Sequence, residues 1–281
     1  MDYGHARRFA TREARRLAGD LYPGPVLMPR GLLRALDPVL AVSLGPAAEG
    51  REAFESSFEA MLRGRPDGPL LLALWGSMSS GELPHEAFRR LVALMPTPMP
   101  QAPVTRGELL AWLHPRASLF ARITLCLAQR DEAEALPPAE RLACGFVVTR
   151  LLVDLPTHLA QGRILLPRSD MEAVGLRREE LLDMVRTPAV DAFLAQECIW
   201  ARDLLRQGLP VCEKVGARLR RGLRAAVLRS EMLLRRVRDP RRDIFRRPPT
   251  LTPHERWRCA VGAWRPLRAK ALPETATAPL S

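Results

Sequence analysis

The sequence predicts a single all-α domain, and three observations support this prediction. Leu, Ala and Arg dominate the composition while aromatic residues make up only 5% of it, and such residues favour helices over strands. Apolar residues recur at helical spacing through most of the 281 positions, which predicts about ten amphipathic helices. A hydrophobic content of 47% with 26% charged residues is typical of a chain with a sizeable core and excludes disorder as its main state.

The first helices are expected to be separated by short segments that contain proline or glycine. The helix that begins near Pro29 is expected to be interrupted at Asp37-Pro38, because proline lacks the amide that the helix needs. Residues 96–103 hold four prolines and predict an extended connector. Thr105 then caps the next helix, with Glu108 reaching back to form a capping box. The ranges expected up to this connector are 5–20, 29–45, 48–63, 69–78 and 85–95.

The remaining helices follow the same periodicity of apolar residues. A non-helical segment, Gly162–Pro167, follows the first two of these helices, and the next helix is expected to begin near Ser169. The ranges expected after the connector are 106–129, 137–160, 177–185, 188–207, 210–237 and 253–264. We therefore expect a basic N-terminal helix over residues 1–24, one all-α domain over residues 25–268 and a disordered tail over residues 269–281, which is rich in Pro, Ala and Thr.

The formal charge of +12 comes almost entirely from arginine, with lysine only at Lys214 and Lys270. A basic composition of this kind has four explanations: binding of nucleic acid, of an anionic membrane surface or of a phosphorylated substrate, or codon bias toward arginine. The scarcity of aromatic residues for base stacking, and the absence of a nucleic-acid motif, argue against nucleic acid. The longest apolar runs are far shorter than a membrane span, and the first residues resemble no signal peptide. We expect a cytoplasmic protein with at most a peripheral membrane contact.

The five cysteines are far apart in the sequence, at Cys126, Cys144, Cys198, Cys212 and Cys259. None has the spacing of a zinc site, and an odd number of distant cysteines does not indicate a disulfide framework. We expect buried thiols in a reducing compartment.

The most informative stretch is Val147–Leu176, VVTRLLVDLPTHLAQGRILLPRSDMEAVGL. It resembles the second signature of the squalene/phytoene synthase family, in which a helix with Asn-x-x-Arg-Asp-x-x-x-Asp runs into Arg-Gly-Arg-x-Tyr-Leu-Pro. The matching positions are Asp154, Gly162, Arg163, Leu166, Pro167, Asp170 and Gly175. Residues 68–88, 105–112 and 238–257 resemble further family segments in the same order, so the resemblance covers roughly residues 25–268 and implies an isoprenoid-synthase-like helical domain around a central cavity.

The resemblance implies that two isoprenyl diphosphates are joined head to head, with Mg²⁺ bridging diphosphate oxygens and two Asp-x-x-x-Asp motifs. The metal cluster stabilises the negative charge that develops on the leaving diphosphate. In this chain Ala47 and Ala48 stand where the first motif belongs, and Glu49 and Glu52 are the nearby acids. A solvated helix face is the ordinary interpretation of these two glutamates.

The second motif is half present. Asp154 matches, but His158 replaces the second aspartate, Arg150 the asparagine and Val153 the arginine. Mg²⁺ prefers oxygen ligands, so Asp154 is a weak metal ligand, and Asp154 with His158 is either a softer metal site or a hydrogen-bonded pair. Pro156 between them bends or ends the helix.

Four further residues are candidates for substrate binding. Arg163 and Arg168 match phosphate oxygens in charge and geometry, although exposed arginines are common in this chain. The resemblance implies that Phe120, Leu119 and Phe146 line the cavity for prenyl chains, with core packing as the alternative. The candidate catalytic residues are Asp154 and His158.

These patterns leave two classes of function open. One is a squalene/phytoene synthase-like protein of isoprenoid metabolism, carotenoid- or hopanoid-type, with reduced or no Mg²⁺-dependent prenyl transferase activity. The other is a non-catalytic pseudoenzyme, similar to the branch of the family that assembles respiratory complex I, whose closing Asp-x-Phe near a Trp is similar to Asp243-Ile244-Phe245 and Trp264. A subunit that supports an active paralogue is a third possibility. The partners follow from these functions: an isoprenyl diphosphate or other lipid-like ligand, a membrane surface or a protein.

Overall fold

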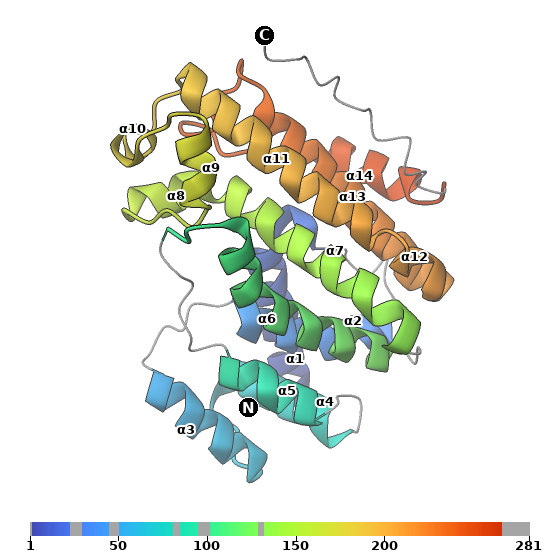
Figure 1. Cartoon of the computed structure of the whole chain (residues 1–281). Helices are drawn as coiled ribbons and strands as arrows, with labels where there is room; N and C mark the ends of the chain where they lie inside the picture. The colour runs from blue at the N-terminus through green and yellow to red at the C-terminus, as the bar shows by residue number, and fades with distance from the viewer. Residues whose placement is uncertain are drawn as a thin grey trace.

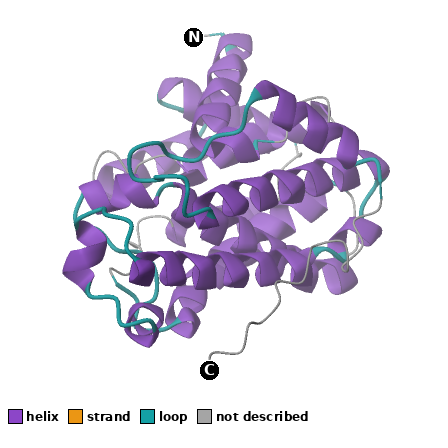
Figure 2. Ribbon diagram, turned by 90° about the horizontal axis from the view of Figure 1, so that it is seen from above, coloured by secondary structure: helices purple, strands orange, loops and turns teal. Residues whose placement is uncertain are grey.

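The structure, a computed structural model, describes residues 2–22, 30–44, 51–80, 85–94, 102–128 and 132–265. All regular elements in these ranges are helices (Figure 2), so the predicted all-α class is confirmed. The tail expected over residues 269–281 and the motif position at Ala47, Ala48 and Glu49 lie outside the described residues.

The helices follow the expected order, with several boundaries moved or divided. In chain order they are α1 (Tyr3–Ala18), the 3-10 helix η1 (Gly19–Leu21), α2 (Arg30–Leu44), α3 (Arg51–Leu62), α4 (Gly68–Ser79), α5 (His85–Leu94), α6 (Arg106–Leu127), α7 (Glu132–Val153), α8 (Leu155–Ala160), α9 (Arg168–Ala173), α10 (Arg178–Leu182), α11 (Pro188–Gly208), α12 (Val211–Lys214), α13 (Ala217–Arg238) and α14 (Pro253–Gly262).

Three predicted boundaries were wrong. α2 runs through Pro38 without a break, where Thr11 and Tyr22 donate hydrogen bonds to the Asp37 carboxylate at 2.7 and 2.8 Å. α7 begins at Glu132 and contains Pro137 and Pro138. The single helix expected over residues 210–237 is divided into α12 and α13, because Val215 and Gly216 have extended backbone.

The long helices α6, α7, α11 and α13 pack in that order, with α14 beside α13 (Figure 1). α1, α2 and α4 form a second group, in contact with the first through α2 and α6. α1 packs through its alanine stripe, Ala6, Ala10, Ala14 and Ala18, which is buried along its length. The small alanine side chains allow close approach of α1 to its neighbours.

The core continues through both groups of helices. α7 and α11 approach each other closely at two glycines, Gly145 and Gly208, where a side chain would meet Leu205 or Leu142 of the opposite helix. Four cysteines are buried as expected, but Cys126 is exposed, since it lies on the outer face of α6. No helix in the described ranges is long and apolar enough to cross a bilayer.

Candidate functional site

Asp154 lies at the junction of α7 and α8, where its backbone caps α8 and Pro156 occupies the first helical turn. The expected break at this proline is therefore present. The carboxylate oxygen Oδ2 of Asp154 accepts a hydrogen bond from Nε of Arg150, one helical turn earlier. Arg150 thus places a permanently charged guanidinium on the Asp154 carboxylate.

His158 follows Asp154 by one turn and is half-buried. Its Nδ1 atom is buried and has no hydrogen-bond partner among the described residues. Burial lowers the pKa of His158, Asp154 opposes this effect, and the charges of Arg163 and Arg150 add to the lowering. The environment therefore favours the neutral imidazole, which offers nitrogen and not oxygen to a ligand.

The residues present do not form a good magnesium site. Within the described ranges, no group of three or more His, Cys, Asp and Glu side chains is arranged to hold a metal ion. Asp154 is already paired with Arg150, and His158 offers nitrogen where Mg²⁺ prefers oxygen. Glu49 lies outside the described residues, so the structure does not place the nearby acids of the first motif relative to Asp154.

The two candidate arginines are placed differently. Arg163 is half-buried, follows Gly162 in its left-handed turn (φ 68°), and lies close enough to His158 to lower its pKa. Arg168 begins α9, where its exposed guanidinium pairs with Glu172 at 3.1 Å. The structure therefore gathers Arg150, Asp154, His158 and Arg163 at one end of α7, and it does not bring Arg168 into contact with them.

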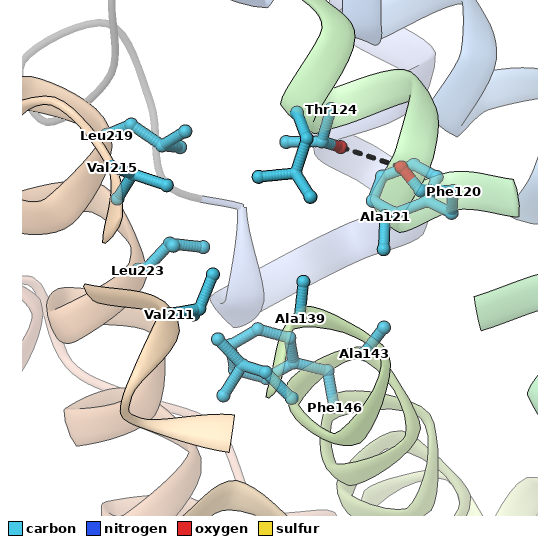
Figure 3. Close-up of a pocket in the computed structure, with 12 residues that line it drawn as sticks. Phe120, Ala121, Thr124, Ala139, Ala143, Phe146, Val211, Val215, Leu219 and Leu223 are labelled. Atoms are coloured by element: carbon cyan, nitrogen blue, oxygen red, sulfur yellow. Dashed lines mark hydrogen bonds between the residues drawn. The ribbon is translucent and has the colours of Figure 1, made fainter. Parts of the chain in front are cut away.

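Phe120 and Phe146 line a small apolar cavity between α6, α7, α12 and α13 (Figure 3). The only polar side chain in the lining, Thr124, is satisfied because its hydroxyl donates to the Phe120 carbonyl at 2.9 Å. Leu119, the third residue expected here, packs against the core outside this lining. The lining residues are Phe120, Ala121, Thr124, Leu125, Ala139, Leu142, Ala143, Phe146, Val211, Val215, Leu219 and Leu223.

The size of this cavity limits what it can accept. Its volume is about 70 Å³, against about 150 Å³ for an engineered apolar cavity that binds benzene. Phe146 precedes Asp154 by two helical turns, so the cavity and the Asp154 cluster are about 12 Å apart along α7. A prenyl chain would have to displace side chains such as Phe146 to enter.

A buried polar cluster, absent from the sequence-based predictions, joins α6, α9 and α11. Nε of Arg106 donates to Oδ2 of Asp170 at 2.7 Å, and Nη2 donates to Oε1 of Glu197 at 3.1 Å. The guanidinium also lies over the Trp200 ring, 5.1 Å from its centroid. A signal existed in the sequence, because Glu197 interrupts the apolar stripe of α11 formed by Val190, Phe193, Leu194, Ala201 and Leu204.

The segment that carries the family resemblance lies against the chain that precedes α6. Ile164, Leu165 and Leu166 of Gly162–Pro167 are buried. Hydrogen bonds join this part of the chain to residues 102–104: Ala102 N–H donates to the Ile164 carbonyl at 2.7 Å, and Ser169 N–H donates to the Val104 carbonyl at 2.9 Å. The most recognisable motif of the sequence is therefore mainly an element of the core.

Glu197 predicts a measurable dependence of stability on pH. Burial, then a hydrogen bond to Asp170, raises the pKa of Glu197 to about 8. The folded chain then binds a proton that the unfolded chain has released, so the free energy of unfolding falls as pH rises from about 4.5 to about 8, by at most about 1.4 kcal/mol per pH unit. Urea unfolding at several pH values should show this fall, and Glu197→Gln should flatten it. An equal slope in both proteins would contradict the assignment.

The all-α fold is that of a helical isoprenoid-synthase type of domain. The family model for squalene/phytoene synthase matches residues 24–265, and the chain belongs to this family. The crystal structure of squalene synthase HpnC from Alicyclobacillus acidocaldarius is similar at 23% identity and a TM-score of 0.68, covering 83% of this chain and 93% of that one. A dehydrosqualene synthase in complex with ligand is similar at 17% identity and a TM-score of 0.75, covering 93% and 96%. No curated protein matches the sequence.

Proposed function

We propose that this chain is a squalene/phytoene synthase-like protein of isoprenoid metabolism with little or no Mg²⁺-dependent prenyl transferase activity. One observation carries the proposal: Arg150 neutralises Asp154, the only aspartate of the second motif. Head-to-head condensation requires metal-bound carboxylates to withdraw the diphosphate, and a carboxylate engaged by a guanidinium is a poor metal ligand. The neutral His158 completes a donor set that does not suit magnesium.

The cluster retains features that support binding of an anion. Arg163 adds a positive charge to the Arg150–Asp154 pair next to a neutral imidazole, and arginine matches phosphate oxygens in geometry. The apolar cavity between α6, α7, α12 and α13 lies further along the same helix, α7. This arrangement supports a lipid-like ligand with an anionic head that is bound and not converted, and whose chain displaces side chains such as Phe146 to enter the cavity.

The proposal predicts the outcome of a direct assay. Incubation with farnesyl or geranylgeranyl diphosphate, Mg²⁺ and NADPH should release no Mg²⁺-dependent diphosphate above background, and Asp154→Asn should leave this result unchanged. The variant Arg150→Asn/His158→Asp, which brings the motif closer to the family pattern, should bind Mg²⁺ more tightly than the natural chain in isothermal titration. Diphosphate release that Asp154→Asn reduces by about 100-fold or more would overturn the proposal.

A second candidate function is that of a non-catalytic assembly factor, and the same Arg150–Asp154 pair favours it. In that function Asp154 would only stabilise the junction of α7 and α8. A strain that lacks this protein separates the two candidates by its defect, either in isoprenoid products or in a respiratory complex. Full complementation by Asp154→Asn is expected in both cases, and a failure of this folded variant to complement would restore a chemical role for the carboxylate.

A further inference from the structure

The outer face of α14 carries an apolar stripe that the proposed function does not use. Trp257, Val261 and Trp264 follow one another at helical spacing and are 62%, 50% and 67% exposed. They are three of the six large apolar residues that are exposed in the described ranges. Trp257 lies in α14 and Trp264 lies two residues after its end. Two exposed tryptophans so close together form an unusual surface, because such rings normally bury most of their area.

The orientation of α14 is set by its opposite face. Cys259 and Ala263 are buried, with Cys259 in contact with Met232 of α13. Thr252 and Glu255 form a capping box at the start of the helix, and the Glu255 carboxylate also binds Arg236. α14 is thereby fastened along α13 at the edge of the molecule (Figure 1), and the tryptophans are presented on a rigid element.

Positive charge flanks the stripe. Arg258 and Arg265 are exposed. Arg258 follows Trp257 on α14 and, at 100° per residue, lies along one side of the stripe, and Arg265 follows Trp264 directly. The guanidinium of Arg221, from α13, lies over the Trp264 ring at 4.0 Å from its centroid. The only acidic residue of α14 is Glu255, and its carboxylate is occupied on the packed side of the helix. The exposed face thus combines apolar rings with cations and no carboxylate.

We propose that this face of α14 docks on the surface of an anionic lipid bilayer. Tryptophan rings favour the headgroup level, where the indole is half apolar and its N–H finds a partner. Arginines beside them reach lipid phosphates, and each contributes to attraction toward an anionic surface. A short apolar stripe alone binds weakly, but stripe and charge together supply the two signals that stable peripheral attachment requires. The inference does not depend on the proposed function, because it involves neither Asp154 nor the cavity.

Flotation with lipid vesicles tests the proposal on the full chain without ligand. The protein should float with vesicles of phosphatidylcholine and phosphatidylglycerol, not with phosphatidylcholine alone, and added salt should weaken the association. Trp257→Ser/Trp264→Ser and Arg258→Gln/Arg265→Gln should each weaken binding by roughly tenfold. Two control variants match these changes. Arg89→Gln/Arg90→Gln removes two exposed arginines of α5, and Val185→Ser removes an exposed apolar residue elsewhere. Both controls should bind vesicles within about twofold of the natural chain.

Several results would overturn the proposal. The proposal fails if the natural chain does not float with anionic vesicles. It also fails if Trp257→Ser/Trp264→Ser and Arg258→Gln/Arg265→Gln both bind as well as the natural chain. If Arg89→Gln/Arg90→Gln weakens vesicle binding as much as Arg258→Gln/Arg265→Gln does, binding depends on net charge and not on this face. If sedimentation shows a dimer that Trp257→Ser/Trp264→Ser converts to a monomer, and vesicles are not bound, the stripe belongs to an interface between two copies of the chain. Circular dichroism of each variant identifies any loss of binding that comes from misfolding.

Discussion

Arg106→Met is expected to lower the free energy of unfolding by about 3 kcal/mol, the lower end of the range for breaking a buried ion pair. Without the guanidinium, the carboxyl groups of Asp170 and Glu197 lose their shared cation in a region where water cannot replace it. Glu197 is fully buried and Asp170 nearly so, whereas the Arg106 side chain is 33% exposed. Because Arg106 is partly exposed, we expect a loss at the lower end of the range for a buried ion pair. Urea unfolding, followed by circular dichroism, measures the change.

A matched control is Arg90→Met on α5. Arg90 pairs with Glu86 at 2.8 Å, but these side chains are 69% and 70% exposed, so its loss should change stability by less than about 1 kcal/mol. Glu197→Gln introduced into Arg106→Met should recover part of the loss at pH values where Glu197 otherwise ionises, because it removes one of the two carboxyl groups left facing each other. Equal effects of Arg106→Met and Arg90→Met would show that the cluster contributes no more than a surface pair.

Gly208→Ala is expected to lower stability by about 2–3 kcal/mol, although alanine is the better helix former. A Cβ atom at Gly208 would lie 2.5 Å from the backbone nitrogen of Leu142 and 2.6 Å from its Cα. These are backbone atoms of α7, so the clash can be relieved only by moving one long helix away from the other. Because Leu142 also lines the apolar cavity, the same movement changes the shape of that cavity.

Gly31→Ala provides the control for the glycine prediction. Gly31 lies exposed in α2 and has no atom within 4 Å of the position of a Cβ. Here only helix propensity acts, and the substitution should raise stability by up to about 1 kcal/mol. Thermal and urea unfolding of both variants should therefore give changes of opposite sign. A stabilising Gly208→Ala would show that α7 and α11 do not approach as closely as the structure places them.

Much of the site could be anticipated from local sequence, and one local signal was overlooked. The gathering of Asp154, His158 and Arg163 follows from their spacing around a helix end and a turn. The Arg150–Asp154 pair was also predictable, because residues four apart on a helix are neighbours. The anion-binding role predicted for Arg168 stays a prediction; Arg168 begins a separate helix, α9, where its guanidinium pairs with Glu172.

The sequence alone determined the helical class, the position of most helices and the family resemblance, since each depends on interactions within a few residues. Caps at Thr105 and Thr252 and periodic apolar faces belong to this group. Tertiary structure decided the contacts between distant segments. Arg106 meets Glu197 across 91 positions, the cavity forms between four helices, and the tryptophans of α14 are exposed because its other face packs on α13. Such contacts depend on how whole helices pack, and periodicity shows that a face is apolar without showing what covers it.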